Sequence, residues 1–161
     1  MEIRHATPKD AVACLNIYAL FVRDTAVTFE DEVPVLAEMH RRIADYGASH
    51  GWFVAEAEGR IAGYAYGSPH RARAAYRTSC DVAIYVDPAF SRRGIGRALY
   101  TALLAALKRQ DFHAAFGGIA LPNDASVRLH QACGFHPVGI YHEVGWKLGE
   151  WHDVSWWQRL L

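Results

Sequence analysis

The chain has 161 residues, 52% of them hydrophobic, which is enough to build one domain around a sizeable core. Lys plus Arg and Asp plus Glu each number 17, and this balance argues against the clustered basic surface of a nucleic-acid or membrane-surface binder. We therefore expect neither nucleic acid nor a membrane as a partner.

Targeting signals and metal-ligand patterns are missing from the sequence. Met1–His5 is short and charged, and Pro8 follows soon after, so no secretory signal is predicted. The most apolar stretch, Ala98–Leu107, is far shorter than the roughly 18–20 residues that span a bilayer. The three cysteines are widely spaced and form neither a metal-ligand pair nor a disulfide framework. We expect a cytoplasmic protein with reduced cysteines and no bound metal.

The first half of the chain predicts two helices and four strands. One helix is capped by Thr7 and has Pro8 at its first position, and the second begins near Pro34. Glu58 and Gly59 form a hairpin turn signal between two of the strands. The predicted strands are Glu2–Ala6, Trp52–Ala57, Arg60–Gly67 and Ser79–Val86.

The second half continues with a long helix whose leucines, from Leu99 to Leu107, recur on one side. A strand at Phe112–Ala120 follows, and then a short helix from its cap Asn123 to about Ala132. The last predicted strands are Val138–Lys147 and Trp151–Leu160. This order predicts a single α/β domain over residues 1–161, with an antiparallel meander first and a helical crossover after the fourth strand.

The segment Ser91-Arg92-Arg93-Gly94-Ile95-Gly96-Arg97, between the fourth strand and the long helix, is the most informative feature. Its glycines permit a turn that points successive N–H groups inward, and the helix start adds unpaired N–H groups and a positive dipole end. The segment predicts a cradle for a phosphate or pyrophosphate, with a simple glycine-rich turn as the alternative. It lacks the Gly-Lys-Ser/Thr of a triphosphate loop and the third glycine of a dinucleotide fingerprint.

This arrangement resembles the GNAT acetyltransferase superfamily, in which a Gln/Arg-x-x-Gly-x-Gly/Ala segment after the fourth strand binds the pyrophosphate of acetyl-CoA. Aligning Gly94 and Gly96 with the family glycines keeps the helix start in place and puts Ser91 at the Gln/Arg position. The other register uses Gly96 and Ala98 and puts Arg93 there. The contacts that the resemblance implies for acetyl-CoA are Ile84, Tyr85, Val86, Arg92, Arg93, Gly94, Ile95, Gly96, Arg97, Asn123 and Ser126.

The superfamily resemblance also implies a fold. We expect a mixed, mostly antiparallel α/β (α+β) sheet of six to seven strands, flanked by about four helices. In such a fold acetyl-CoA lies where the fourth and fifth strands diverge.

Further segments, which run nearly end to end, are similar to the phosphinothricin and methionine sulfoximine acetyltransferase branch. They are Thr28-Phe29-Glu30, Arg73–Thr78, Asp81–Val86, Leu121-Pro122-Asn123, Val144–Lys147 and Gly149–Val154. Members of this branch acetylate the α-amine of glutamate-like molecules that carry a phosphinate, sulfoximine or similar head. The resemblance implies such a small-molecule substrate and a homodimer, with the late tryptophans as core or dimer contacts.

Two loops are candidate substrate-binding segments. Arg73, Tyr76 and Arg77 predict an anion-binding wall, because guanidinium groups bind carboxylates and phosphinates through paired hydrogen bonds. The resemblance places the loop with Phe29 and Glu30 over the substrate. For both loops the alternative is an ordinary solvated surface.

Acetyl transfer to an amine needs a base, because an α-amine is mostly protonated at neutral pH. Asp81 stands where the branch carries an acidic residue, usually Glu, and a structural pairing with the arginine loop is the alternative. A main-chain N–H of Tyr85 or Val86 is expected to stabilise the oxyanion. His130 is the candidate proton donor to the CoA thiolate, with a packed helix residue as the alternative.

Three other functions stay open. The first is acetylation of another amine, such as a polyamine, an aminoglycoside or a protein N-terminus, although the arginine loop repels polycations. The second is a CoA-binding sensor without catalysis, which the replacements Asp81 for Glu and His130 for Tyr permit. The third is a nucleotide-phosphate binder.

Overall fold

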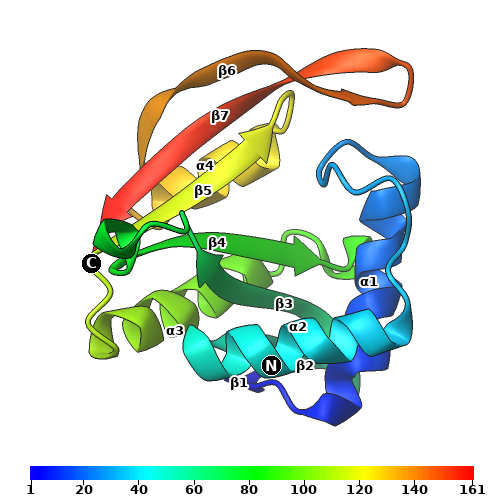
Figure 1. The fold of residues 1–161 in the computed structure, drawn as a ribbon. Coiled ribbons are helices and arrows are strands. Elements are labelled where there is room, and N and C mark those ends of the chain that lie inside the picture. The colour runs from blue at the N-terminus through cyan, green and yellow to red at the C-terminus, as the bar shows by residue number, and fades with distance from the viewer.

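The computed structural model describes all residues, 1–161, as four α-helices and seven strands (Figure 1). The helices are α1 (Ala11–Asp24), α2 (Leu36–Ser49), α3 (Ile95–Arg109) and α4 (Asp124–Ala132). The strands are β1 (Glu2–His5), β2 (Trp52–Ala57), β3 (Arg60–Pro69), β4 (Ser79–Val86), β5 (Ala114–Ala120), β6 (His136–Lys147) and β7 (Glu150–Leu160).

All seven strands form one sheet, in the order β1-β2-β3-β4-β5-β7-β6. Neighbouring strands are antiparallel except β4 and β5, which run parallel. A parallel pair needs a crossover connection, and α3 supplies it between these two strands. The predicted fold class, a mixed and mostly antiparallel sheet with four helices, is therefore confirmed.

The parallel pair is short. Ser79–Asp81 of β4 pair with Ala114–Phe116 of β5, and beyond this stretch β4 runs on to Val86 with β3 as its partner. β5 meanwhile continues alongside β7. Figure 1 shows the two strands diverging, so the main-chain groups of β4 that face β5 are left without strand partners. This gap is the structural origin of the site described below.

Two hydrophobic cores fix the sheet between helices. On one face α1 and α2 pack against Trp52, Val54 and Tyr64, and on the other α3 packs against Phe53 and Ala55. Successive residues of β2 thus enter opposite cores, as the alternation of a strand requires. Residues of β4 pack into both cores, and the start of α3 is held by the core on its own face through Ile95 and Leu99. The cysteines are buried and free, namely Cys14, Cys80 and Cys133.

Element boundaries differ from the prediction at both ends of the chain. The first helix begins at Ala11, because Pro8–Asp10 form a 3-10 turn whose aspartate accepts the Thr7 N–H at 2.8 Å. β6 begins at His136 and includes Pro137, which an edge strand tolerates because one of its sides needs no donor. None of the helices combines the length and the apolar run that crossing a bilayer requires. No three His, Cys, Asp or Glu side chains are grouped as metal ligands.

Candidate active site

A cleft of about 900 Å³ opens where β4 ends and α3 begins. Its wall combines the end of β4, the turn before α3, the first turn of α3 and the start of α4. Ten of the eleven predicted cofactor contacts line it: Ile84, Tyr85, Val86, Arg92, Gly94, Ile95, Gly96, Arg97, Asn123 and Ser126. The structure thus brings two segments that are distant in sequence to one cleft.

The turn before α3 contains two left-handed backbone conformations, at Arg92 with φ 61° and at Gly94 with φ 77°. α3 begins at Ile95, and the Ala98 N–H donates to the Gly94 carbonyl at 3.1 Å. The N–H groups of the first three helical residues precede this bond and have no acceptor within the helix. Together with the positive end of the helix dipole, these N–H groups give the cleft the donors that an anion site needs.

Strand alternation decides which main-chain groups of β4 face the gap. The Asp87 N–H donates to a carbonyl of β3, whereas the Thr78 carbonyl accepts N–H groups from the β5 side. Because successive residues of a strand direct their N–H groups to opposite neighbours, the even-numbered residues from Val82 to Val86 face the gap. The Tyr85 N–H faces β3. Of the two predicted oxyanion donors, this geometry favours Val86.

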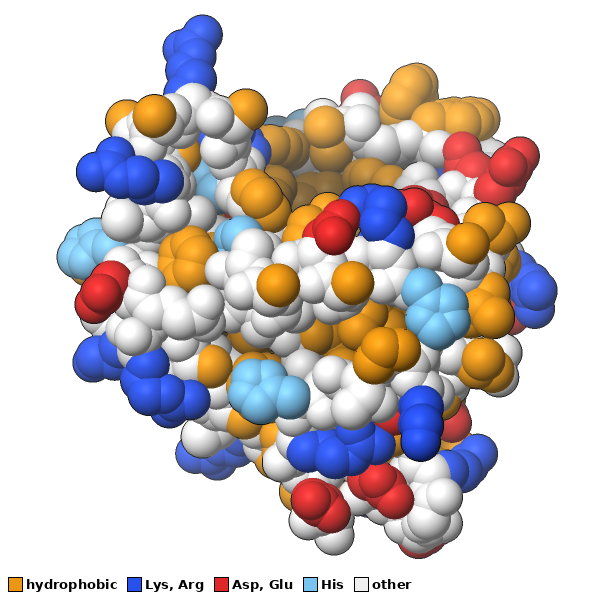
Figure 2. Space-filling model, turned by 60° about the horizontal axis from the view of Figure 1, so that its bottom comes forward, with side chains coloured by type: hydrophobic (Ala, Val, Ile, Leu, Met, Phe, Trp, Pro, Cys, Tyr) orange, Lys and Arg blue, Asp and Glu red, His pale blue; other side chains and the backbone are white.

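A second space of about 460 Å³, which we call the inner pocket, lies between the β4–β5 gap and the arm formed by β6 and β7. Asp81 is the one charged residue in its lining. Phe29, Tyr141, Val144 and Trp156 contribute much of its apolar wall. Figure 2 shows a hollow near the top of the molecule. Hydrophobic side chains line this hollow, and acidic and basic side chains lie on its rim.

A small cavity of about 60 Å³, which we call the passage, shares lining residues with both the cleft and the inner pocket. Val27 and Tyr85 border all three spaces. A molecule in the cleft and a second molecule in the inner pocket can therefore approach each other along β4.

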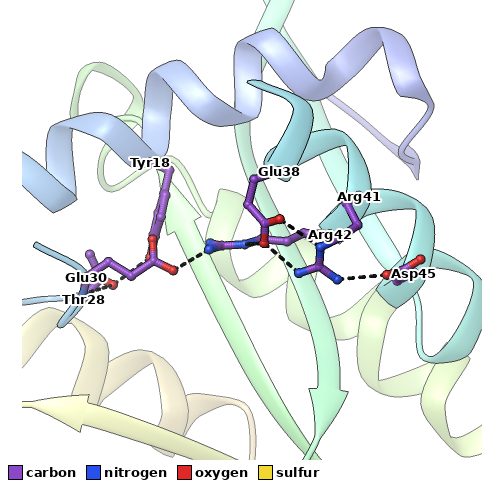
Figure 3. A network of polar contacts seen from close by, with 7 residues as sticks. All are labelled: Tyr18, Thr28, Glu30, Glu38, Arg41, Arg42 and Asp45. Atoms are coloured by element: carbon purple, nitrogen blue, oxygen red, sulfur yellow. Dashed lines mark hydrogen bonds and ion pairs between the residues drawn. The ribbon is translucent and has the colours of Figure 1, made fainter. Parts of the chain in front are cut away.

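The loop between α1 and α2 lies over the inner pocket and is tethered from two directions. On the helix side, the hydroxyls of Tyr18 and Thr28 lie 2.8 Å apart, and Glu30 pairs with Arg42 at 2.6 Å (Figure 3). On the arm side, the Nζ of Lys147 donates to the Thr28 carbonyl at 2.8 Å. Burial lowers the pKa of Lys147. These contacts connect the loop, which forms the roof of the inner pocket, to both halves of the chain.

Phe29 reaches the inner pocket from this loop, because Gly145 on β6 leaves room for its ring. A Cβ added at Gly145 would overlap the ring atoms of Phe29. The ring also lies 6.2 Å from that of His152, measured between centroids. The lack of a side chain at Gly145 thus determines where the Phe29 ring lies in the pocket wall.

Asp81, the predicted base, lies where β4 separates from β5. Its Oδ1 lies 2.6 Å from Nδ1 of His70, so its partner is a histidine and not the arginine loop. Burial raises the pKa of Asp81, and the hydrogen bond from His70 opposes that shift. Oδ2 has no hydrogen-bond partner in the protein and is available to a molecule in the pocket.

His130 borders the passage, but both of its nitrogens are engaged. Nδ1 donates to the Ser126 carbonyl at 2.8 Å, and Nε2 accepts from the Tyr100 hydroxyl at 3.0 Å. Burial lowers the pKa of His130, so the ring is neutral at pH 7. The geometry does not support the predicted proton-donor role, because no N–H of the ring is directed at the cleft. The alternative of a packed helix residue fits these contacts.

Arg93 is the one predicted cofactor contact that does not line the cleft. Its Nη1 lies 2.6 Å from Oε1 of Glu58, and its guanidinium lies 5.0 Å from the centroid of the Phe90 ring. The ion pair and the aromatic face hold this side chain against Glu58 and Phe90, neither of which lines the cleft. The register that aligns Gly94 and Gly96 with the family glycines does not need it.

Four predicted substrate contacts lie outside the inner pocket. Glu30 faces α2 and pairs with Arg42, because the loop turns its side chain outward after Phe29. Arg73, Tyr76 and Arg77 are exposed around a 3-10 turn beyond the end of β3. Tyr76 alone approaches the site, with its ring centroid 6.0 Å from that of His70. The predicted anion-binding wall therefore does not line the pocket of a single chain.

The arm and His70 also belong to the site, although neither was predicted as part of it. Tyr141, Val144 and Trp156 come from the last two strands, and the pairing of β7 with β5 brings them to the pocket. His70 could have been identified, because the two strands predicted on either side of its loop pair as a hairpin. That pairing puts Ser68 opposite Asp81, and His70 follows Ser68 by two residues.

Comparison with known proteins places this geometry in a family. A family model described as an acetyltransferase (GNAT) domain matches residues 3–156. A phosphinothricin N-acetyltransferase from Streptomyces coelicolor is 40% identical, over 100% of this chain and 96% of that protein. An L-methionine sulfoximine/L-methionine sulfone acetyltransferase from Salmonella typhimurium is 32% identical, over 100% of this chain and 95% of that protein.

A solved structure agrees with these relatives. A GNAT superfamily phosphinothricin acetyltransferase from Sinorhizobium meliloti, in complex with AcCoA, matches with a TM-score of 0.96 at 33% identity. The match covers 99% of this chain and 88% of that one. The resemblance predicted from the sequence is confirmed, and the chain belongs to the GNAT acetyltransferase family.

Proposed function

We propose that this protein transfers the acetyl group of acetyl-CoA to the α-amine of a small glutamate-like molecule, such as phosphinothricin or methionine sulfoximine. The observation that carries the proposal is the passage between the cleft and the inner pocket along β4. It allows an acetyl donor and an amine to be bound at once, as direct attack in a ternary complex requires. Asp81 stands on the amine side of that passage.

The cleft fits acetyl-CoA through its set of donors. The unpaired N–H groups of the first turn of α3 suit a diphosphate, and exposed Arg92, Arg97 and Arg128 add positive charge. The free edge of β4 up to Val86 suits the amides of the pantetheine arm, as an added strand would. When bound, acetyl-CoA supplies an activated acetyl group as a thioester. The AcCoA complex of the Sinorhizobium meliloti relative supports this assignment.

The inner pocket suits a small amino-acid analogue. Its volume of about 460 Å³, apolar walls and single carboxylate suit a compact molecule with one amine. The activities named for the Streptomyces coelicolor and Salmonella typhimurium relatives support phosphinothricin and methionine sulfoximine as the substrate class. We keep Arg73 and Arg77 as proposed contacts for the anionic head at the outer rim.

Asp81 accepts the proton that the ammonium form of the substrate must lose, through Oδ2 or a bridging water. The nitrogen lone pair is then free to form the new bond to the acetyl carbon while the carbon–sulfur bond breaks. As the new bond forms, the nitrogen gives up a second proton to the departing thiolate, so one proton is released in total for each acetyl group transferred. The Val86 N–H donates to the carbonyl oxygen as negative charge develops there, and such a donor is worth about 3–4 kcal/mol.

We also propose that two copies of the chain pair through the β6–β7 arm. Trp146 and Trp151 are 59% and 57% exposed and pack edge to face with their ring centroids 5.0 Å apart. The edge strand β6, which carries Trp146, also exposes Val138 and Ile140. Several large apolar side chains exposed on one arm favour association. Sedimentation should show a dimer that Trp146→Ser weakens, and a monomeric wild type would reject the pairing.

The function is tested by following CoA release with a thiol reagent in the presence of acetyl-CoA and a panel of amines. Phosphinothricin or methionine sulfoximine should release CoA much faster than spermidine, an aminoglycoside or a peptide with a free N-terminus. CoA release that is no faster with either glutamate analogue than with these other amines would reject the substrate class. Tight calorimetric binding of acetyl-CoA without transfer to any amine would favour a sensor, and effective competition by ATP would favour a nucleotide-phosphate binder.

A further inference from the structure

His70 and Asp81 form a hydrogen-bonded pair at the wall of the inner pocket. Asp81 lines the pocket, whereas His70 lies behind it. Nδ1 of His70 is 2.6 Å from Oδ1 of Asp81. Because an ionised carboxylate only accepts hydrogen bonds, Nδ1 carries the proton in this pair. The bond occupies one carboxylate oxygen and leaves Oδ2 for a ligand in the pocket.

Aromatic neighbours hold the imidazole of His70 in place. It stacks on Phe116 with a centroid distance of 4.3 Å and an interplanar angle of 16°. The rings of Tyr76 and Trp156 meet it edge-on at 6.0 and 6.5 Å. Phe116 is also the register partner of Asp81 in the parallel β4–β5 pair. A ring fixed from three sides can hold the carboxylate in a single orientation.

The surroundings of the pair contain few other charges. The charged groups that act on Asp81 are His70 and Arg71, and Arg71 is exposed and donates to the His70 carbonyl at 3.0 Å. Tyr76 is the other titratable side chain in contact with His70. Phe116 from β5 and Trp156 from β7 also pack on the ring, and neither of these side chains titrates. His70 is therefore the main group that favours the ionised form of Asp81, and aromatic side chains enclose its ring.

We propose that His70 is a positioning residue for acetyl transfer: it holds Asp81 with Oδ2 toward the inner pocket and keeps that carboxylate ionised to accept the amine proton. The inference rests on the proposed function. Burial alone disfavours a charged carboxylate, and a hydrogen bond donated to the charged form offsets that effect. Asp81 is also one methylene shorter than Glu, so its orientation matters more for reaching the amine.

Two variants separate the hydrogen bond from the packing. His70→Phe keeps a planar ring against Phe116 but removes the N–H, whereas His70→Asn keeps a donor near the position of Nδ1. In His70→Phe we expect kcat to fall about 10-fold and the acid limb of kcat/KM to move up by about one pH unit. His70→Asn should return the acid limb toward the wild-type position. Acetyl-CoA affinity should stay unchanged in both variants.

A second measurement works without turnover. In ¹³C NMR titration of the Asp81 carboxyl, the pKa should rise in His70→Phe and return toward the wild-type value in His70→Asn. A wild-type pH profile together with an unshifted Asp81 titration in His70→Phe would overturn the inference. Failure of the wild-type protein to acetylate any amine would instead reject the proposed function, and the titration would still decide whether His70 controls Asp81.

Discussion

The cleft and the inner pocket meet along β4, but they are built differently. The cleft is formed largely by one continuous stretch from β4 to α3, and its most useful donors are main-chain N–H groups. The inner pocket is formed by side chains from the α1–α2 loop, the sheet and the β6–β7 arm. A main-chain site depends on local turn geometry, whereas a side-chain site depends on tertiary packing. Substitutions should therefore separate acetyl-CoA binding from amine binding and chemistry.

The largest effect is expected on the pocket side, at the proposed base. Asp81→Asn keeps the shape of the side chain and removes its ability to accept a proton, so kcat should fall by about 10²–10⁴-fold. The Kd for acetyl-CoA should not change. Asp111→Asn is the matched control, because Asp111 is exposed and has a φ of 66° that Asn tolerates. Steady-state kinetics and calorimetry measure both, and a wild-type kcat in Asp81→Asn would place the base elsewhere.

The cleft is tested through its left-handed glycine. Gly94→Ala should weaken acetyl-CoA binding about 10-fold, because an alanine there costs about 1–2 kcal/mol in the left-handed conformation and favours another turn. Gly149→Ala is the control: both glycines have a φ of 77°, and an added Cβ meets nothing within 4 Å at either. Both variants should lose similar thermal stability. An equal effect of the two on acetyl-CoA Kd in calorimetry would contradict a main-chain cradle.

The contrast between the two regions also explains what could be predicted from sequence. A turn with Gly94 and Gly96 before an amphipathic helix is a local pattern, and strand and helix order follow from periodicity, so the turn and the element order were predictable. The seven-stranded sheet and the position of the cleft between β4 and β5 came from the family resemblance. The position of Arg93 was not predictable, because its ion pair with Glu58 depends on the neighbouring β2–β3 hairpin. The choice between Tyr85 and Val86 likewise needed the observed pairing with β3.

The inner pocket was harder to predict, because its walls meet only after the chain has folded. Phe29 was identified by resemblance, but the next residue, Glu30, turns to α2 and pairs with Arg42. Tyr141 and Trp156 reach the pocket through strand pairings that no local pattern specifies. Side-chain sites assembled across a sheet carry little local signal, even when their individual residues are correctly singled out.

The roof of the inner pocket offers a test of packing. Gly145→Ala places a methyl group where the Phe29 ring lies, and such overpacking costs about 1–3 kcal/mol. The ring should move, raising the KM for the amine about fivefold with little change in acetyl-CoA Kd. Gly139→Ala on the same strand is the control, since an added Cβ there meets nothing within 4 Å. An unchanged amine KM in Gly145→Ala would show that Phe29 does not shape the substrate site.

His130, at the passage between the two regions, predicts a pH effect on stability. Burial lowers its folded pKa below the unfolded value of about 6.5, so protonation favours the unfolded chain. The stability that neutral His130 contributes is present above about pH 6.5 and is lost as the pH falls toward the folded pKa. In urea unfolding, the difference between wild type and His130→Gln should shrink from pH 7.5 to pH 5. A large loss of kcat with unchanged stability would instead restore the proton-donor role.

The smallest effects are expected at the rim, where two neighbouring arginines of α2 differ in what they hold (Figure 3). Arg41 is 51% exposed and pairs within its own helix, with Glu38 at 2.6 Å and Asp45 at 2.9 Å. Arg42 is 19% exposed and also reaches Glu30 on the pocket loop at 2.6 Å. Exposed pairs within a helix contribute little, so Arg41→Ala should leave the urea midpoint and the kinetics unchanged.

Arg42→Ala should release the loop that carries Phe29. We expect the KM for the amine to rise about threefold, because the lost ion pair is partly shielded, and kcat to change less. Added salt should raise the wild-type KM toward that of Arg42→Ala, since it screens the same pair. If Arg41→Ala and Arg42→Ala changed the amine KM equally, the loop would be held by Lys147 and Tyr18 alone, and the pocket roof would be independent of α2.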